Sequence, residues 1–353
     1  ADGRFVAFQS AAGNLVEGTD NFQWDIFVHD RLTGVTTLES LTSAGRPGAS
    51  GPGDFRFHGS MHPRISADGR YVLFDSDARN FPGHEYCGVD RCFRALLHDR
   101  LTGSTTLAAR GSGGAAANGP SFMAALTPDG RSVLFASPAT SLPGANGFWQ
   151  LYLHDRVTGV THLVSAATDG SAGLMDTGQV GTAPSAMEFP VTTAALSDDG
   201  RFASFISAAP NLVQQDTNGG LDTFVHDVKT GVTTRVSVTS TGKQGTADAV
   251  AEKDLVARAT SISGDGRYIA FDSGSSDLVP GDTNQQPDVF VHDRLTRTTV
   301  RVSVSSVGAQ RSERSFFPAM AGDGSVVVFA SDQTGPLFGA KSVFVHVIPQ
   351  LLP

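Results

Sequence analysis

The sequence predicts an all-β protein, a six-bladed β-propeller with four antiparallel strands in each blade. The first observation is a block that recurs six times, at intervals of roughly 60 to 70 residues, a period typical of propellers and solenoids. The second is that short apolar strands and turns fill every block, without helical periodicity. Each block has an Asp-Gly turn, beginning at Asp2, Asp68, Asp129, Asp199, Asp265 and Asp323. Its second landmark is His-Asp, at His29, His98, His154, His226 and His292, with a degraded copy at His346.

The fifth block illustrates the expected order of strands. The first strand is Thr260–Ser263, followed by the hairpin turn Gly264–Arg267, where Asp-Gly supplies the positive φ angles of a tight turn. The second strand is Tyr268–Ser273, rich in aromatic and β-branched residues. After a longer loop, Asp288–His292 forms the third strand and Thr298–Val304 the fourth.

The blocks divide the chain into six blades of a single domain, residues 1–353. The predicted blades span approximately residues 1–43, 60–110, 120–166, 190–240, 258–305 and 315–353. The first blade lacks its first strand and the last ends after its third, so both are incomplete. Ring closure needs a strand from one terminus, because an open ring leaves unpaired edges. We expect residues upstream of Ala1 to supply it, with the C-terminal tail as the alternative.

Composition narrows the function classes. The net charge is -9, which argues against a nucleic-acid backbone as partner. No stretch approaches the ~20 apolar residues that a transmembrane helix requires. Cys87 and Cys92 lie in one loop and are too few for a zinc site. They predict a local disulfide and hence a periplasmic or extracellular location, with two free thiols as the alternative.

Two sequence runs carry a resemblance to a known family. They read Ser-x-Asp-Gly-Arg-Tyr/Phe-Val-x-Phe-x-Ser and Val-Phe-Val-His-Asp-Arg-x-Thr-Gly, and their copies cover nearly the whole chain. The chain resembles the TolB-like six-bladed β-propellers built from PD40 repeats, which are related to WD40 repeats. The resemblance implies the fold but not one function, because such propellers serve as scaffolds, receptors and enzymes.

An acidic loop between the second and third strands predicts a calcium site in two blocks. Oxygen ligands one, three and seven positions along such a loop suit a hard cation, and loops of this type recur in related PD40 repeats. The alternative is an Asx-turn without metal. The candidate ligands are Asp216, Asn218 and Asp222 in the fourth block and Asp282, Asn284 and Asp288 in the fifth. The first block keeps Asn21 and Asp25, a weaker candidate, whereas Arg94, Gln150 and Ser342 replace the anchoring Asp elsewhere.

The residues that recur in every block are expected to be structural. Six histidines spread over six blocks cannot converge on one ion, so each is expected to bond a neighbouring blade or a turn. The Asp after each His is expected to cap the following turn. The Arg of Asp-Gly-Arg and that of His-Asp-Arg are expected to pair with nearby Asp residues.

Long loops and inter-blade connections should gather on the rim opposite the tight turns, and binding is expected there. Trp24 and Trp149 precede third strands on this rim, where they either contact a partner or pack under the loop.

The favoured function is a non-enzymatic, exported binding or scaffold subunit of a larger assembly. It would dock a protein or glycan partner on the long-loop rim and hold structural calcium. The alternative is a hydrolase or lyase acting on a polysaccharide or peptide at the channel mouth, although no catalytic motif is visible. The candidates for such an active site are His58, His62, Glu85, Glu188 and Asp254.

Overall fold

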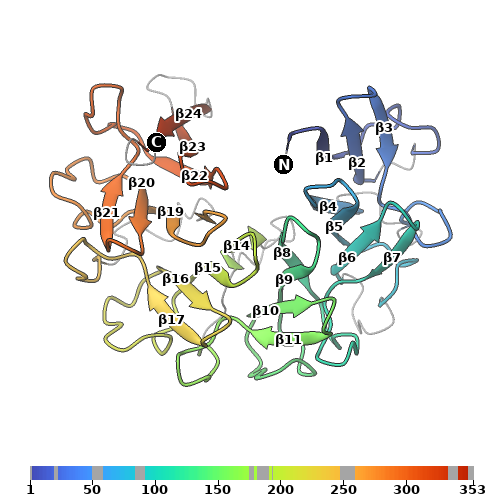
Figure 1. The fold of residues 1–353 in the computed structure, drawn as a ribbon, viewed down its shortest axis with the longest axis horizontal. Coiled ribbons are helices and arrows are strands. Elements are labelled where there is room, and N and C mark those ends of the chain that lie inside the picture. Colours follow the sequence, from blue (N-terminus) through green and yellow to red (C-terminus); the bar gives the residue numbers. More distant parts are fainter. Residues whose placement is uncertain are drawn as a thin grey trace. The chain divides into compact units, whose positions relative to one another are not determined.

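All regular elements in the described part of the chain are β-strands (Figure 1). The structure, a computed structural model, describes residues 2–19, 23–49, 59–83, 92–174, 179–180, 191–192, 194–246, 259–332 and 341–348. Nothing in these ranges forms a helix of the length and apolarity needed to cross a bilayer. The expected all-β class is therefore confirmed.

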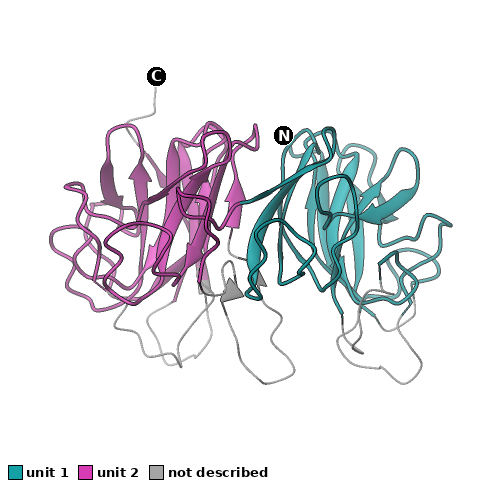
Figure 2. Ribbon diagram, turned by 90° about the horizontal axis from the view of Figure 1, so that it is seen from below, with its two compact units in different colours: residues 1–163, 185–187 teal, residues 164–184, 188–353 magenta. Residues whose placement is uncertain are grey.

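The chain divides into two compact units (Figure 2). Unit 1 comprises residues 1–163 and 185–187, and unit 2 comprises residues 164–184 and 188–353. A single domain over residues 1–353 stays a prediction.

Unit 1 contains three antiparallel sheets, one for each of the first three blocks. The first sheet has three strands, β1 (Phe5–Ser10), β2 (Asp25–Asp30) and β3 (Val35–Leu38). The second has four, β4 (Ser60–Ile65), β5 (Tyr71–Ser76), β6 (Arg94–Asp99) and β7 (Ser104–Leu107). The third comprises β8 (Phe122–Leu126), β9 (Ser132–Ser137), β10 (Gln150–Asp155) and β11 (Val160–Leu163). In each sheet, neighbours in sequence are neighbours in space.

Unit 2 repeats this arrangement for the last three blocks. The fourth sheet comprises β14 (Ala194–Leu196), β15 (Phe202–Ser207), β16 (Asp222–Asp227) and β17 (Val232–Arg235). The fifth comprises β18 (Thr260–Ile262), β19 (Tyr268–Ser273), β20 (Asp288–Asp293) and β21 (Thr298–Arg301). The sixth has three strands, β22 (Ser315–Met320), β23 (Val326–Asp332) and β24 (Lys341–Val347). A two-stranded pair, β12 (Gln179–Val180) and β13 (Val191–Thr192), was not expected from the sequence.

The strand order of the fifth block was predicted correctly, and its fourth strand is shorter than expected. β21 ends at Arg301 rather than Val304. The amides of Val302 and Ser303 both donate to the Val289 carbonyl, which bends the chain off the sheet edge. A small hairpin, closed by a bridge between Val304 and Gln310, then begins.

The Asp-Gly turn also joins neighbouring sheets within each unit. Gly266 has φ +73°, and a Cβ there would meet the Phe202 ring of the preceding sheet at 2.2 Å. Arg294 lies over the same ring, 4.2 Å from its centroid, and donates to the Gly266 carbonyl at 2.7 Å. Two further sets repeat this contact in unit 1: Phe5 with Gly69 and Arg100, and Tyr71 with Gly130 and Arg156. Glycine is required here both by its φ and by the aromatic ring.

The recurring histidine holds a second joint between sheets. His292 Nδ1 lies 2.9 Å from Thr299 Oγ1, and that hydroxyl donates to the Val238 carbonyl of the preceding block at 2.5 Å. The same relay links three further His-Thr pairs to a preceding carbonyl: His98 with Thr105, His154 with Thr161, and His226 with Thr233. These histidines therefore bond a threonine of their own sheet rather than a neighbouring blade or a turn, and the threonine makes the link to the preceding block.

This relay predicts a cost for Thr299→Val. The substitution keeps the shape of the side chain but leaves His292 Nδ1 and the Val238 carbonyl without their hydroxyl, so we expect a loss of about 1–3 kcal/mol of unfolding free energy. Urea unfolding followed by circular dichroism measures it. Thr298→Val, at an exposed neighbour, should change stability by less than about 0.5 kcal/mol. Equal losses in the two variants would refute the relay.

Candidate functional site

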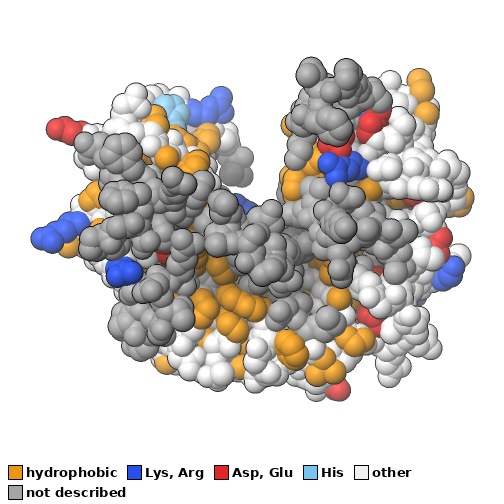
Figure 3. Space-filling view, turned by 180° about the vertical axis from the view of Figure 1, so that it is seen from behind, with side chains coloured by type: hydrophobic (Ala, Val, Ile, Leu, Met, Phe, Trp, Pro, Cys, Tyr) orange, Lys and Arg blue, Asp and Glu red, His pale blue; other side chains and the backbone are white. Residues whose placement is uncertain are grey.

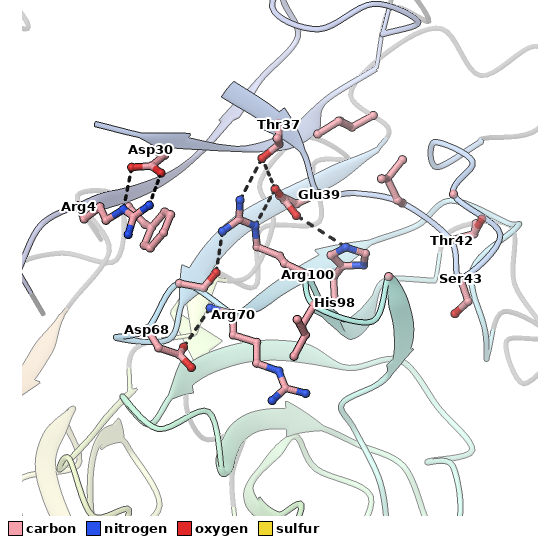
Figure 4. A pocket seen from close by; sticks show the side chains of 17 residues that line it. Arg4, Asp30, Thr37, Glu39, Thr42, Ser43, Asp68, Arg70, His98 and Arg100 are labelled. Atoms are coloured by element: carbon pink, nitrogen blue, oxygen red, sulfur yellow. Dashed lines mark hydrogen bonds and ion pairs between the residues drawn. The ribbon is translucent and has the colours of Figure 1, made fainter. Parts of the chain in front are cut away.

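A cavity of about 850 Å³ lies in unit 1 between the first and second sheets (Figure 4). Its lining combines the Asp-Gly turns, at Arg4 and Asp68, with the His-Asp turns, at Asp30 and Arg100. It therefore lies toward the tight-turn rim, whereas the sequence directed attention to the long-loop rim. We call it the Glu39 pocket, after the lining residue that departs most from the repeat.

Glu39 is a carboxylate at a position that the repeat keeps apolar. It follows β3 and is 3% exposed. Taking a charge out of water costs free energy that only close partners can offset. The residues at the same place in the next four blocks are all buried and apolar: Ala108, Val164, Val236 and Val302.

The partners of Glu39 come from its own strand and from the second sheet. Arg100 Nε donates to Glu39 Oε1 at 2.9 Å, and Thr37 Oγ1 donates to the same oxygen at 2.5 Å. Arg100 is itself fixed by a 2.7 Å bond to the Gly69 carbonyl and by the Phe5 ring. Among the described residues, both hydrogen bonds to the Glu39 carboxylate go to Oε1, and none goes to Oε2.

His98 faces the second oxygen of this carboxylate. Its Nε2 lies 3.7 Å from Glu39 Oε2, beyond hydrogen-bond distance. The Thr105 hydroxyl donates its hydrogen to the Leu41 carbonyl, so toward His98 it can only accept. His98 Nδ1 lies 2.8 Å from Thr105 Oγ1 and must therefore be the donor, which assigns the ring hydrogen to Nδ1. Burial lowers the pKa of His98, which favours the neutral ring. Two hydrogen-bond acceptors, His98 Nε2 and Glu39 Oε2, therefore lie side by side in the pocket.

Arg4, Asp30 and Arg70 of the lining are held in ion pairs, whereas Asp68 accepts from Ser66 Oγ and from the Arg70 amide. Arg4 binds Asp30 through two bonds of 2.9 and 2.7 Å, and Arg70 binds Asp99 with the same two distances. The bond from Arg70 lowers the pKa of Asp99 to about 2. Asp99 also accepts from the Leu101 amide and so caps its turn, as expected. The same Arg-Asp pair recurs at Arg131–Asp155, Arg201–Asp227 and Arg267–Asp293.

The two predicted calcium loops form matching networks in unit 2. Asp222 accepts from Ser237 Oγ at 2.5 Å and from Gln244 Nε2 at 2.9 Å. Gln244 Nε2 also donates to Asp216 at 2.9 Å, and Arg235 Nη1 lies 3.4 Å from both carboxylates. In the fifth block Asp282 and Asp288 share Gln310 and Arg301 in the same way.

The asparagines of these loops make Asx-turns. Asn218 Oδ1 accepts from the Gly220 amide at 3.0 Å, and Asn284 Oδ1 accepts from the Gln286 amide at 3.0 Å. Their amide groups donate to backbone carbonyls of the next connection, Gly245 and Arg311. This is the geometry of the metal-free alternative.

Sequence reasoning missed Arg235, Gln244 and their fifth-block counterparts. The sequence did contain a signal for them: only the two blocks with acidic loops carry an arginine at the position of Arg235 and a glutamine at the position of Gln244. The first three blocks have leucine where Arg235 and Arg301 lie, namely Leu38, Leu107 and Leu163. Comparing the blocks for residues that change together with the acidic loop would have identified the pair.

The donor set does not fit a calcium ion as it stands, because a guanidinium lies beside the two carboxylates where calcium needs a shell of oxygens. Calcium at these loops stays a prediction, with the condition that the ion displaces Arg235 and Gln244.

This condition makes calcium binding measurable. Because a ligand of the native state raises stability, calcium should raise the melting temperature, and more so in Arg235→Met, where no guanidinium competes. Differential scanning calorimetry in calcium and in chelator reports both values. A melting temperature that calcium changes in neither protein would show that these loops do not bind calcium.

The remaining candidate ligands and the cysteines are only partly described. Asn21 and Cys87 lie outside the described residues, so the calcium site of the first block and the Cys87–Cys92 disulfide stay predictions. Asp25 is buried and accepts from Ser40 Oγ at 2.6 Å, which repeats the contact of Asp222 with Ser237.

The two tryptophans are half-buried. The Trp149 ring packs against Phe122 with 5.5 Å between centroids, as expected for a residue that packs under its loop. The Trp24 carbonyl accepts from the Ser60 amide. A partner contact through either residue stays a prediction.

One candidate of the enzyme hypothesis lies in the described residues. His62 Nδ1 is 3.2 Å from Asp75 Oδ2, and the other oxygen of Asp75 accepts from the Met123 amide at 2.7 Å. Burial raises the pKa of Asp75. The pair thus links β4 and β5 to β8 of the next sheet. His58, Glu85, Glu188 and Asp254 lie outside the described residues.

Charged side chains do not gather on the face drawn in Figure 3. Lys and Arg (blue) and Asp and Glu (red) of the described residues are scattered and mixed there.

Comparison with known proteins gives structural likeness only. No family model and no curated protein matches the sequence. TolB from Acinetobacter baumannii is similar over 88% of this chain, with 16% identity and a TM-score of 0.44, and this chain spans 55% of its length. A putative TolB from Agrobacterium tumefaciens is similar over 82% of this chain and 78% of its own, with 16% identity and a TM-score of 0.45. The β-propeller domain of the Trilobed protease from Pyrococcus furiosus matches 98% of this chain and 80% of its own, with 9% identity and a TM-score of 0.49.

Proposed function

We propose that this chain is an exported six-bladed β-propeller of the TolB-like kind that serves as a non-catalytic docking subunit. Support comes from the sixfold repeat, from one antiparallel sheet per block, and from the joints that connect successive sheets in each unit. The docking site is the Glu39 pocket in unit 1, and the partner is a protein.

The buried carboxylate of Glu39 carries the proposal. An apolar residue at this place packs without electrostatic cost, as Val164, Val236 and Val302 do in other blocks. Glu39 instead requires Arg100 and Thr37 to offset its desolvation. Departures from a stabilising repeat are expected at functional sites, so we assign Glu39 to binding.

The chemistry of the pocket selects a nitrogen donor. His98 Nε2 and Glu39 Oε2 both present lone pairs, and one donor nitrogen with at least two hydrogens satisfies them together. An ammonium or a primary amide has such a nitrogen, so the partner inserts a lysine or glutamine side chain. Leu101 lines the pocket and is 74% exposed, which offers apolar surface to the methylene groups of that side chain.

A glycan fits the pocket less well. Sugars commonly stack on an open aromatic face, and Phe5 is the aromatic residue in this lining. Arg4 and Arg100 lie over its ring at 4.7 and 5.3 Å from the centroid, so this ring is already engaged. A protein partner is therefore favoured.

The proposal is tested by capture from native extract with the purified chain and its Glu39→Val variant. Val is the residue that the repeat itself places there, and melting curves verify that the variant folds. We expect the wild-type chain to retain a protein that Glu39→Val releases. Thr298→Val, at an exposed position in unit 2, serves as the control and should retain it. Equal capture by wild type and Glu39→Val, or capture of a glycan alone, would contradict the proposal.

A further inference from the structure

Arg297 has a backbone conformation that the repeat otherwise gives to glycine. Its φ is +60°, in the left-handed region that a residue with a Cβ adopts only at a cost in free energy. The Arg297 amide closes its turn by donating to the Asp293 carbonyl at 2.7 Å. In four other blocks a glycine makes the same bond, also with positive φ: Gly34, Gly103, Gly159 and Gly231. An arginine that strains a turn which glycine closes without strain indicates a function for its side chain.

Arg297 lines a cavity of about 550 Å³ in unit 2, between the fourth and fifth sheets. One wall comes from residues within 234–242, which belong to β17 and the hairpin after it. The other wall comes from His292, Arg294 and Arg297. None of the described lining residues is an aspartate or a glutamate, although the whole chain has a net charge of -9. The lining is therefore positively charged in an acidic protein.

Two of the basic residues in the lining add no available charge to the cavity. The Arg235 guanidinium lies 3.4 Å from both Asp216 and Asp222, so these carboxylates offset its charge. Burial lowers the pKa of His292 to about 4, so its ring is neutral at pH 7. The positive charge of the cavity therefore comes from the other two arginines.

Arg294 and Arg297 both carry charges without an ion-pair partner. Arg294 donates to the Gly266 carbonyl at 2.7 Å and stacks on the Phe202 ring, and neither contact neutralises its charge. Burial lowers the pKa of Arg294, and the attraction of Asp227 opposes this only in part. In the parts of the chain that the structure describes, Arg294 forms no ion pair, and the Arg297 guanidinium forms neither an ion pair nor a hydrogen bond. A bound anion would offset the desolvation of the first guanidinium and give the second a partner.

The corresponding cavity in unit 1 has only one of these two arginines. It lies between the second and third sheets, has a volume of about 420 Å³, and is lined by Arg156 and Gly159 at the places of Arg294 and Arg297. Its remaining arginine, Arg110, donates to the Leu107 and Gly114 carbonyls at 2.9 and 2.8 Å. The second available guanidinium is thus specific to the cavity in unit 2.

We propose that the cavity lined by Arg294 and Arg297 binds a phosphate group. Phosphate carries nearly two negative charges at neutral pH, which match the two guanidinium groups, and its oxygens accept the paired N–H donors of arginine. Thr239 and Thr241 on the opposite wall have hydroxyl oxygens 2.8 Å apart, and their mutual bond uses only one of the two hydroxyl hydrogens. The second hydrogen is a further donor for the phosphate. This site is independent of the Glu39 pocket.

The volume of the cavity leaves two sources for the phosphate group. A cavity of this size is typical of sites for small organic molecules, and it also admits inorganic phosphate. Isothermal titration calorimetry of the 353-residue chain, at neutral pH and constant ionic strength, uses inorganic phosphate and glycerol 3-phosphate as probes. We expect saturable binding of both. Equal affinities would assign the site to free phosphate, and tighter binding of glycerol 3-phosphate would assign it to a phosphorylated small molecule. No saturable binding of either probe would overturn the proposal.

Arg297→Gly separates binding from stability, because glycine is the residue that the repeat itself has at this position. We expect this variant to bind inorganic phosphate at least about tenfold more weakly. The melting temperature of the ligand-free variant should rise, because the left-handed turn is relieved of its side chain. A side chain that only stabilises the turn would give the opposite pair of results, a lower melting temperature and unchanged binding, which would refute a binding role.

Lys229→Gln is the matched control. Lys229 is exposed and lies in the equivalent turn of the fourth block, so the substitution removes the same charge from unit 2 outside the cavity. It should bind phosphate as the wild-type chain does. Equal weakening by Lys229→Gln and Arg297→Gly would show a general effect of net charge and would contradict a site at Arg297.

Discussion

Asp288→Ala is expected to lower the free energy of unfolding of the fifth sheet by about 3–5 kcal/mol, because it removes the more deeply buried of the two carboxylates beside Arg301 and leaves Ser303 and Gln310 without their acceptor. Asp288 is fully buried, accepts from Ser303 at 2.5 Å and from Gln310 at 3.1 Å, and lies 3.4 Å from Arg301. Burial raises the pKa of Asp288, because it disfavours the charged carboxylate. The hydrogen bonds from Ser303 and Gln310 and the charge of Arg301 offset part of this desolvation penalty. Native-state hydrogen exchange at β20 measures the loss.

Asp288→Asn provides the matched comparison. The amide keeps the shape and one oxygen acceptor but not the charge, so we expect a loss of roughly 1–3 kcal/mol. The two variants thus separate packing and hydrogen bonding from the charge. A loss below 1 kcal/mol for Asp288→Ala would contradict a network in which Asp288 is the anchor.

Gly266→Ala is expected to destabilise unit 2 by about 2–4 kcal/mol, from a left-handed φ and from overpacking together. The added Cβ would lie 2.2 Å from the Phe202 ring, which is confined by Arg201 and Arg294. Tryptophan fluorescence does not report this loss directly, because Trp24 and Trp149 are both in unit 1. Hydrogen exchange at the amides of β19 measures this loss of stability instead.

Gly308→Ala isolates the contribution of the ring. Gly308 has φ +78° and nothing within 4 Å of an added Cβ, so only the backbone strain of about 1–2 kcal/mol applies. Equal losses at the two glycines would show that the aromatic joint adds nothing to the turn.

Much of the fold followed from the sequence because its signals are local. The Asp-Gly turn before Tyr268 and the alternation of Tyr268–Ser273 fix a hairpin within a few residues, and the structure has β19 at those bounds. The end of β21 was missed, because it depends on the Val289 carbonyl in a neighbouring strand. The β12–β13 pair was missed as well, since its strands are two residues each.

The candidate site was not found from sequence for a different reason. The importance of Glu39 depends on its burial and on Arg100, which lies 61 positions away and belongs to another sheet. Comparing the blocks by position would have shown one carboxylate among Ala108, Val164, Val236 and Val302. The acidic loops attracted attention instead, although Arg235 and Arg301 each already offset part of the charge of two carboxylates.

The central claim is that His98 Nε2 and Glu39 Oε2 form an acceptor pair that binds a nitrogen donor. Nitrogen NMR of the His98 ring, with and without a short peptide containing lysine or glutamine, tests it most directly. We predict a neutral ring with its hydrogen on Nδ1, and an Nε2 signal that moves with lysine or glutamine peptides but not with acetyl-lysine, whose amide has one hydrogen. A hydrogen on Nε2, or a signal that no peptide moves, would contradict the claim.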